Sequence, residues 1–204
     1  GGGFGSKIYI YPEEIVCLWA SKKTGVPVKW TADRTEAFMT DAHGRDHISK
    51  VKMAFDADHR ITALKVDTIA NLGAYMSLFS SAVPTYLYAT LLSGQYAIPA
   101  INANVRTVYT NTVPVDAYRG AGRPEATYLL ERTMETAARE LGLSPAELRR
   151  INFIRSFPYQ TPVIMNYDAG DYEASLNAAM DAADWAGFAA RRTEAEGRGK
   201  KRGI

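Results

Sequence analysis

Two arginines and two glycines stand directly before a predicted helix, in the stretch "AYRGAGRPEA". Pro124 suits the first turn of a helix, so the N-cap falls at Gly122 or Arg123. Free N–H groups at a helix start attract anions, glycines such as Gly120 let a ligand approach the backbone, and the planar fork of Arg119 matches a phosphate. The stretch therefore predicts a clamp for a phosphate or another polyanion. The alternative is a glycine turn with solvated or ion-paired arginines, and the residue types alone favour neither.

A second glycine loop opens the chain, as "GGGFGSK" at residues 1–7. It would let a flat ligand approach the backbone, with Phe4 as a stacking face. It is not a phosphate-binding P-loop, because the Gly-Lys-Ser/Thr order and the upstream glycine are missing. The other loop also lacks the full G-x-G-x-x-G pattern, since Glu125 stands where the third glycine would be. Taken alone, residues 1–7 are best explained as a flexible turn.

The remaining reactive side chains form no catalytic constellation. His43 and His47 are four residues apart, but Gly44 and strand-like neighbours argue against a metal pair on a helix. Cys17 falls on the apolar side of a short predicted helix, where packing is its expected role. No Ser-His-Asp arrangement can be argued. We therefore assign no catalytic residue and no metal ligand from the residues themselves.

The first half of the chain predicts one helix and several strands. Residues 12–24 begin at a proline, end before Gly25 and carry one apolar face, formed by Ile15, Leu18 and Trp19. Residues 26–33 alternate as a short strand. Residues 46–72 predict a hairpin that turns at "ADHR", with one slip in the alternation that indicates a bulge. Two more segments follow: an irregular buried segment with a helical centre at 74–100 and a strand at 102–111.

The second half is mainly helical by its pattern. A helix is predicted from 124 to 141, ended by a glycine and carrying an i,i+4 pair of Glu135 with Arg139. Ser144 opens the next helix with a capping box, and residues 171–185 form another amphipathic helix. Strands and helices alternate irregularly, so the predicted fold class is α+β, with a mixed arrangement of sheet and helices.

Composition excludes several classes of protein. The 204 residues are 47% hydrophobic and 23% charged, as in ordinary globular proteins, and the net charge of +2 gives no nucleic-acid footprint. Apolar runs are too short for a membrane span. The single cysteine rules out a disulfide framework and fits a reducing, cytoplasmic location. No linker is visible, and the chain starts in a glycine run without methionine, so we expect residues 1–204 to be an internal fragment forming part of one domain.

The two glycine loops together resemble the two signatures of the molybdenum hydroxylase large-subunit family. This family includes xanthine dehydrogenases, aldehyde oxidoreductases and carbon monoxide dehydrogenases. The stretches "KKTGVPVKWTADRTEAFMTDAHGRDH" and "ELGLSPAELRRINFI" are also similar to it, so the resemblance covers essentially the whole chain in the family's order. More narrowly, "AYRGAGR" resembles the motif of form II carbon monoxide dehydrogenase large subunits. The resemblance implies a fragment of a molybdenum-cofactor-binding domain.

The resemblance also implies roles for individual residues. Those matched to cofactor binding are Gly3, Phe4, Gly5, Arg119 and Gly120; those matched to positions facing the substrate are Ile8, Gly120 and Ala121. Established carbon monoxide enzymes carry a copper-holding cysteine where Gly120 stands, and xanthine-oxidising members carry a glutamate where Ile8 stands. These departures disfavour a purine substrate and leave carbon monoxide, an aldehyde and an N-heterocycle open.

The implied cofactor is molybdenum bound to molybdopterin, which in bacteria often carries a cytosine nucleotide. Its sulfur ligands come from the pterin, which fits the poverty of cysteine and histidine here. The family oxidises small molecules with oxygen from water and passes electrons to iron–sulfur clusters and FAD on partner subunits, in a dimer of heterotrimers. Its glutamate base lies beyond residue 204, so we expect this piece to be inactive by itself. A non-catalytic anion-binding or assembly module is the alternative from another functional class.

Overall fold

The computed structural model describes residues 2–204; Gly1, which opens both the predicted loop and the predicted domain, lies outside the described residues. Helices and strands are mixed, so the predicted α+β class is confirmed. In chain order the elements are α1 (Pro12–Thr24), α2 (Arg34–Thr40), β1 (His47–Phe55), β2 (Ile61–Asn71), α3 (Tyr86–Ala89), β3 (Ile101–Val108), α4 (Arg123–Leu141), α5 (Pro145–Asn152), β4 (Tyr159–Gln160), β5 (Asn166–Tyr167), α6 (Tyr172–Ala182) and α7 (Phe188–Gly197).

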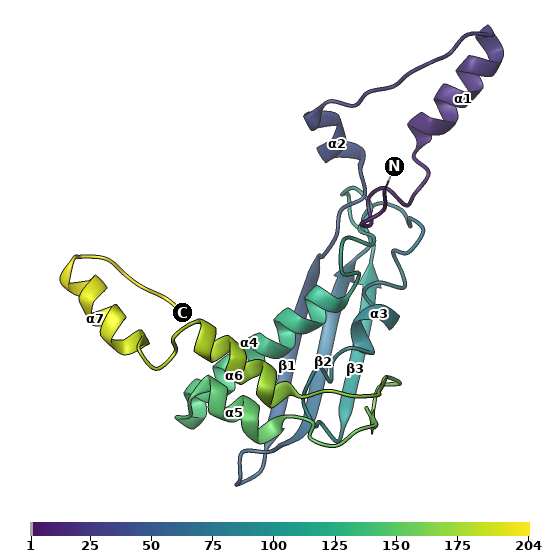
Figure 1. The fold of residues 1–204 in the computed structure, drawn as a ribbon. Coiled ribbons are helices and arrows are strands. Elements are labelled where there is room, and N and C mark those ends of the chain that lie inside the picture. Colours follow the sequence, from purple (N-terminus) through teal and green to yellow (C-terminus); the bar gives the residue numbers. More distant parts are fainter. Residues whose placement is uncertain (1) are drawn as a thin grey trace.

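A three-stranded sheet in the order β1-β2-β3 forms the centre (Figure 1). β1 and β2 pair antiparallel as the predicted hairpin, and β3 lies parallel to β2. The register shifts between Ala54 and Phe55. The hairpin thus contains an irregularity, and it lies at the end of β1 opposite to Ile48. The Ile48 side chain is 69% exposed and points outward.

Helix α4 covers one face of this sheet, with α5 beside it (Figure 1). Leu130 and Met134 lie on its buried face, as the helical spacing predicts. The main core joins this face to β2 and to the irregular segment that contains α3. Its fully buried side chains include Leu64, Val66, Tyr88, Leu92, Tyr96, Ile98, Leu130, Met134 and Leu148. The core thus fixes the start of α4, where the glycine-arginine loop ends.

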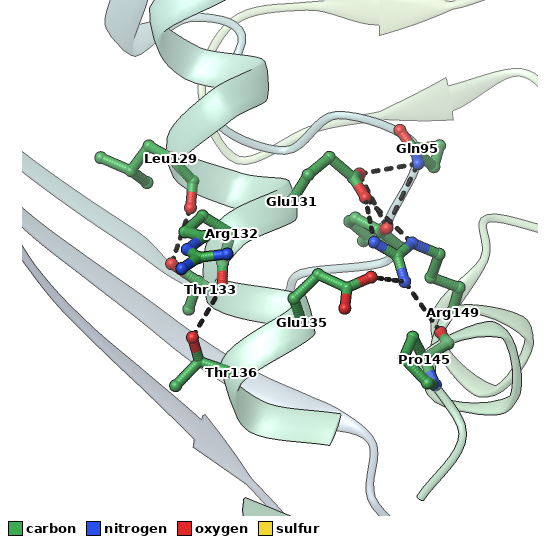
Figure 2. Close-up of polar contacts among 10 residues, drawn as sticks. Gln95, Leu129, Glu131, Arg132, Thr133, Glu135, Thr136, Pro145 and Arg149 are labelled. Atoms are coloured by element: carbon green, nitrogen blue, oxygen red, sulfur yellow. Dashed lines mark hydrogen bonds and ion pairs between the residues drawn. The ribbon is translucent and has the colours of Figure 1, made fainter. Parts of the chain in front are cut away.

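A polar network holds α5 against α4 (Figure 2). Arg149 contacts Glu131 at 2.8 Å and Glu135 at 3.0 Å, and the buried Tyr96 hydroxyl donates to Glu131 at 2.8 Å. The predicted side-chain pair of Glu135 with Arg139 is wrong. Arg139 instead donates from Nε to the main-chain oxygen of Glu135, at 3.2 Å. The carboxylate turns to Arg149 because that arginine is brought close by the packing of α5, which spacing along α4 cannot reveal.

The segment before the sheet departs most from expectation. Helix α1 and its end at Gly25 are confirmed, but α1 has no buried residue and Trp19 is 60% exposed. The strand predicted at 26–33 is wrong, because no strand of residues 2–204 pairs with that stretch. Helix α2 follows it, started by a capping box between Asp33 and Glu36. Both helices extend away from one end of the sheet (Figure 1).

The predicted capping box at Ser144 is also wrong. Helix α5 does begin at Pro145, but the Ser144 hydroxyl makes no capping hydrogen bond. The proline already removes one of the free N–H groups that a cap would satisfy. Among the described helices, none combines the length and the apolar character that crossing a bilayer requires.

Candidate functional site

The two glycine loops are in direct contact, although they lie far apart in the sequence. A Cβ atom on Gly5 would lie 2.1 Å from the carbonyl oxygen of Ala117 and 2.6 Å from the Cα of Tyr118. Gly5 also has φ +103°, a conformation that L side chains rarely adopt. Only glycine fits here, so the residue type is what allows the first loop to lie against the second.

Two tyrosine hydroxyls anchor the first loop. Tyr9, which is 7% exposed, donates to the carbonyl oxygen of Ala117 at 2.8 Å, and Tyr11 donates to that of Ser6 at 2.8 Å. Burial, reinforced by the nearby negative charge of Asp116, raises the pKa of Tyr9 above its usual value. Tyr9 therefore stays a neutral donor, and the contact between the loops persists across physiological pH.

A buried carboxylate organises the approach to the second loop. Asp116 is 1% exposed, and its oxygens accept from the backbone N–H groups of Ala117 at 2.5 Å and Phe79 at 2.9 Å. The Ser80 hydroxyl lies 3.5 Å away. Such bonds compensate the cost of burying a charge. Asp116 thereby ties the irregular segment around residue 79 to the chain just before Arg119.

The second loop makes an uncommon turn into α4. Gly120, Ala121 and Gly122 have φ values of +110°, +42° and +91° in succession. A Cβ on Gly122 would lie 2.6 Å from the carbonyl carbon of Leu87, so the turn packs tightly on α3. Gly122, one of the two predicted positions, is the N-cap of α4, and no side chain caps this helix start. The Arg123 N–H donates to the carbonyl oxygen of Gly120 at 3.1 Å and Pro124 has no N–H, so in the first turn of α4 only the Glu125 N–H has no acceptor within residues 2–204.

The Arg119 side chain lies on the open side of this turn. Its guanidinium sits 5.1 Å from the centre of the Phe4 ring, so the structure brings these two predicted site residues together. Phe4 is 64% exposed and has φ +56°. Among residues 2–204, no carboxylate pairs with Arg119. The two loops together thus present an aromatic face, an unpaired cation and a helix start.

Comparison with known families gives this arrangement a context. The sequence profile of the family described as "Molybdopterin cofactor-binding domain" matches residues 1–153, which include both loops and all three strands of the main sheet. The chain belongs to the molybdopterin cofactor-binding domain family. The last 51 residues, 154–204, lie outside the matched stretch.

Several proteins resemble this family member over nearly its whole length. The gamma subunit of the 6-hydroxypseudooxynicotine dehydrogenase complex of Paenarthrobacter nicotinovorans is 36% identical over 100% of the chain, and the carbon monoxide dehydrogenase large chain of Hydrogenophaga pseudoflava is 40% identical over 95%. Quinoline 2-oxidoreductase from Pseudomonas putida 86 superposes with a TM-score of 0.90, at 34% identity over 98% of the chain. The chain spans only about a quarter of each of these proteins (26%, 25% and 26%).

The other predicted site residues of this molybdopterin cofactor-binding domain lie around the same contact. The Ile8 N–H donates to the carbonyl oxygen of Gly5 at 2.9 Å, so Ile8 folds back over the first loop, and its side chain is 48% exposed. Gly3 lies beside it, with 3.8 Å between the position of a Cβ and Cγ1 of Ile8. Ala121 is half-buried and packs against the small core around Tyr9 and Val83.

Sequence reasoning missed the residues that hold the loops in place, chiefly Tyr9, Asp116 and Arg45. The only sequence signal was an aspartate inside the apolar run before the second loop. Arg45 reaches the second loop from the chain between α2 and β1, with its guanidinium 5.0 Å from the Tyr118 ring centre.

A groove of about 830 Å³ between β1 and α4 begins beside Arg45 and Glu125. In the described part of the chain no three His, Cys, Asp or Glu side chains are grouped to hold a metal.

Proposed function

We propose that this chain is the part of a molybdenum hydroxylase large subunit whose two glycine loops hold molybdopterin, and that the parent enzyme resembles carbon monoxide dehydrogenase. The observation that carries this proposal is the contact of Gly5 with Ala117. It places Phe4 and Arg119 on one open face, although the loops are separated by most of the matched domain. When bound, the cofactor would supply the centre at which a substrate is oxidised with oxygen derived from water.

The chemistry of the donors fits an anionic, flat cofactor. Molybdopterin carries a phosphate, and an unpaired guanidinium beside an uncapped helix start favours a phosphate. The N–H groups of Gly120 and Gly122 donate to no acceptor within residues 2–204, so they add two further donors. The Phe4 ring offers a face for a planar group. We assign cofactor binding to Gly3, Phe4, Gly5, Arg119 and Gly120.

The substrate-facing positions are proposed to be Ile8, Gly120 and Ala121. A Cβ on Gly120 would lie 2.5 Å from Cγ of Pro124, so this loop accommodates no side chain at residue 120. Gly120 therefore offers no metal ligand next to the cofactor. This observation supports a second candidate function, hydroxylation of an N-heterocycle, which the names of the nicotine- and quinoline-oxidising relatives also suggest.

The parent should work with partner subunits. Relatives are named as subunits of complexes, which supports the presence of partner subunits, and we propose that these are an iron–sulfur subunit and a flavin subunit that accept the electrons. We propose a cytosine dinucleotide form of the cofactor and a dimer of heterotrimers, in the cytoplasm. The catalytic base is proposed to lie beyond residue 204, so residues 1–204 alone should show no turnover.

The proposal is tested with Arg119→Ala in the full-length subunit, purified with its partners. Molybdenum per subunit should fall sharply, while the cofactor-free forms of the variant and the wild type should melt at the same temperature, because an exposed arginine contributes little to folding. Arg106→Ala is the matched control: Arg106 is exposed on β3 and forms no ion pair within residues 2–204. Normal molybdenum content in Arg119→Ala would remove the main support for a cofactor site here.

A second measurement separates the two candidate substrates. The molybdenum-loaded complex is given carbon monoxide, an aldehyde or an N-heterocycle as the sole reductant, and reduction of an artificial electron acceptor is followed. Turnover with carbon monoxide supports the first candidate and requires a metal arrangement that does not use residue 120. Turnover with a heterocycle alone supports the second.

A further inference from the structure

Arg45 contacts three parts of the second loop and its helix. The backbone next to Arg45 runs beside the backbone that precedes the second loop, because the Asp116 N–H donates to the carbonyl oxygen of His43 at 2.7 Å. A Cβ on Gly44 would lie 2.5 Å from Cβ of Tyr118, so glycine is needed for this close approach. Arg45 itself has φ +65°, which costs a residue other than glycine about 1 kcal/mol. Packing on both sides of Arg45 holds it in this conformation.

The Arg45 guanidinium makes three contacts. It lies over the Tyr118 ring, its Nη2 donates to the carbonyl oxygen of Arg119, and its Nε is 3.9 Å from Oε2 of Glu125. The Glu125 side chain is 8% exposed, and its Oε2 accepts no hydrogen bond within residues 2–204. The Arg45–Glu125 contact is thus an ion pair without a direct hydrogen bond, and the buried negative charge of Glu125 holds the guanidinium near the loop.

The bond to the Arg119 carbonyl fixes the orientation of the next N–H. A trans peptide is planar, with its C=O and N–H pointing in opposite directions. Holding the Arg119 oxygen toward Arg45 therefore points the Gly120 N–H away from Arg45. The residue that follows this peptide is a glycine at φ +110°, so its own backbone preference would not prevent the peptide from turning over. Arg45 supplies a restraint from outside the loop, through its bond to the Arg119 carbonyl oxygen.

We propose that Arg45 is a positioning residue, held by Glu125, that locks the Arg119–Gly120 peptide so that the Gly120 N–H is presented as a donor to the cofactor or to an oxygen atom of the substrate. This inference rests on the proposed function. It extends that function to Arg45, which does not lie on the face that the two loops offer to a ligand. The N–H of Gly120 has no acceptor within residues 2–204, which fits a donor reserved for a ligand. The Arg119 side chain is free to stack on Phe4 because Arg45 holds only its main chain.

The test uses the full-length subunit in its complex, with Arg45→Ala, Arg45→Lys and the control Arg106→Ala. In Arg45→Ala we expect molybdenum content to be retained, kcat to fall about 10- to 100-fold and KM to change much less, because a misplaced group costs transition-state stabilisation. Hydrogen exchange of the amides at 118–122 should rise about tenfold as the peptide gains a second orientation. Arg45→Lys keeps the charge but cannot hold Arg119 and Glu125 with one planar fork, so partial recovery is expected.

Several outcomes would overturn the inference. Wild-type kcat and wild-type amide exchange in Arg45→Ala would show that the peptide needs no such restraint. If Arg45→Ala does not assemble, Arg45→Lys and Glu125→Gln decide by the same criteria, and failure of all three to assemble would show a purely structural role. The proposed function is tested separately, by Arg119→Ala. If Arg119→Ala loses molybdenum while Arg45→Ala behaves like the wild type, only the inference about Arg45 is refuted.

Discussion

The carbonyl oxygen of Ala117 occupies the space in which a side chain on Gly5 would begin, 2.1 Å from the position of its Cβ. The contact between the two loops therefore depends on a missing methyl group. Because the φ of Gly5 is also positive, a larger residue can be accommodated only if the loops separate. One residue type thus couples the local conformation of the first loop to the position of Arg119 in the second.

Gly5→Ala should destabilise the full-length subunit by roughly 2–4 kcal/mol, from backbone strain and overpacking together. We also expect lower molybdenum content, because Phe4 and Arg119 would no longer share one face. The melting temperature and the metal content of the purified complex check this. Gly3→Ala is the matched control for stability in the same loop: its Cβ would meet nothing closer than 3.8 Å, so a change within about 0.5 kcal/mol in the free energy of unfolding is expected. Equal effects of the two variants would contradict the argument.

Gly120→Ala should also destabilise the subunit, for a reason that a second substitution can isolate. The new Cβ would meet the Pro124 ring at 2.5 Å, and the residue would remain at φ +110°. Pro124→Ala removes the ring but leaves the backbone conformation, so the double variant should recover part of the loss. A double-mutant cycle on melting temperature measures this coupling. Strict additivity of the two substitutions would show that the loop moves away from Pro124.

Elements that bury one face against a neighbouring element could be predicted from the sequence. The alternation at 46–72 predicted the hairpin, and the helical spacing of Leu130 and Met134 predicted α4. Both predictions were right because the apolar side chains in each pattern are those that the core buries. The same reasoning failed at 26–33, where Val26 and Trp30 alternate with polar residues but are 56% and 52% exposed. A pattern shows which side chains favour burial, and it does not show what covers them.

The structure brings together Phe4 and Arg119, two residues that the sequence motifs indicate as site residues, but the sequence did not reveal the residues that support the loops. The glycines, Phe4 and Arg119 stand in short motifs, and the chemistry of these motifs can be inferred from the sequence alone. Asp116 and Arg45 act across long separations, on the Phe79 N–H and the Arg119 carbonyl, and neither contact follows any local spacing rule. Tertiary packing decides them, as it decides the partner of Glu135.

The stability of the subunit should depend on His47 in mildly acidic solution. Burial lowers the pKa of His47 below its usual value near 6.5, although the nearby charge of Glu125 acts in the opposite direction. The unfolded chain then binds this proton more readily than the folded one, so stability is lost as pH falls from about 6.5 through the lower pKa of the folded state.

His47→Gln should therefore flatten the decline in melting temperature between about pH 7 and pH 5. At pH 8, where His47 is neutral in both states, the variant reports only the loss of packing of His47 on the Tyr88 ring, 5.1 Å away between centres. Comparing the slopes, and not the absolute values, isolates the titration. An unchanged slope would place the acid sensitivity elsewhere in the subunit.

Arg149 should contribute more to stability than Arg139, although both lie near Glu135. Arg149 is 15% exposed and bridges Glu131 and Glu135, so Arg149→Ala leaves two carboxylates without their cation and should cost about 1–3 kcal/mol (Figure 2). Arg149→Lys should lose an intermediate amount, because an ammonium cannot contact both carboxylates with one planar group. Arg139→Ala removes an exposed side chain bonded only to the main chain and should change stability by no more than about 0.5 kcal/mol. Thermal unfolding of the three variants ranks them, and a loss in Arg149→Ala as small as that expected in Arg139→Ala would mean that α5 is held to α4 by apolar packing alone.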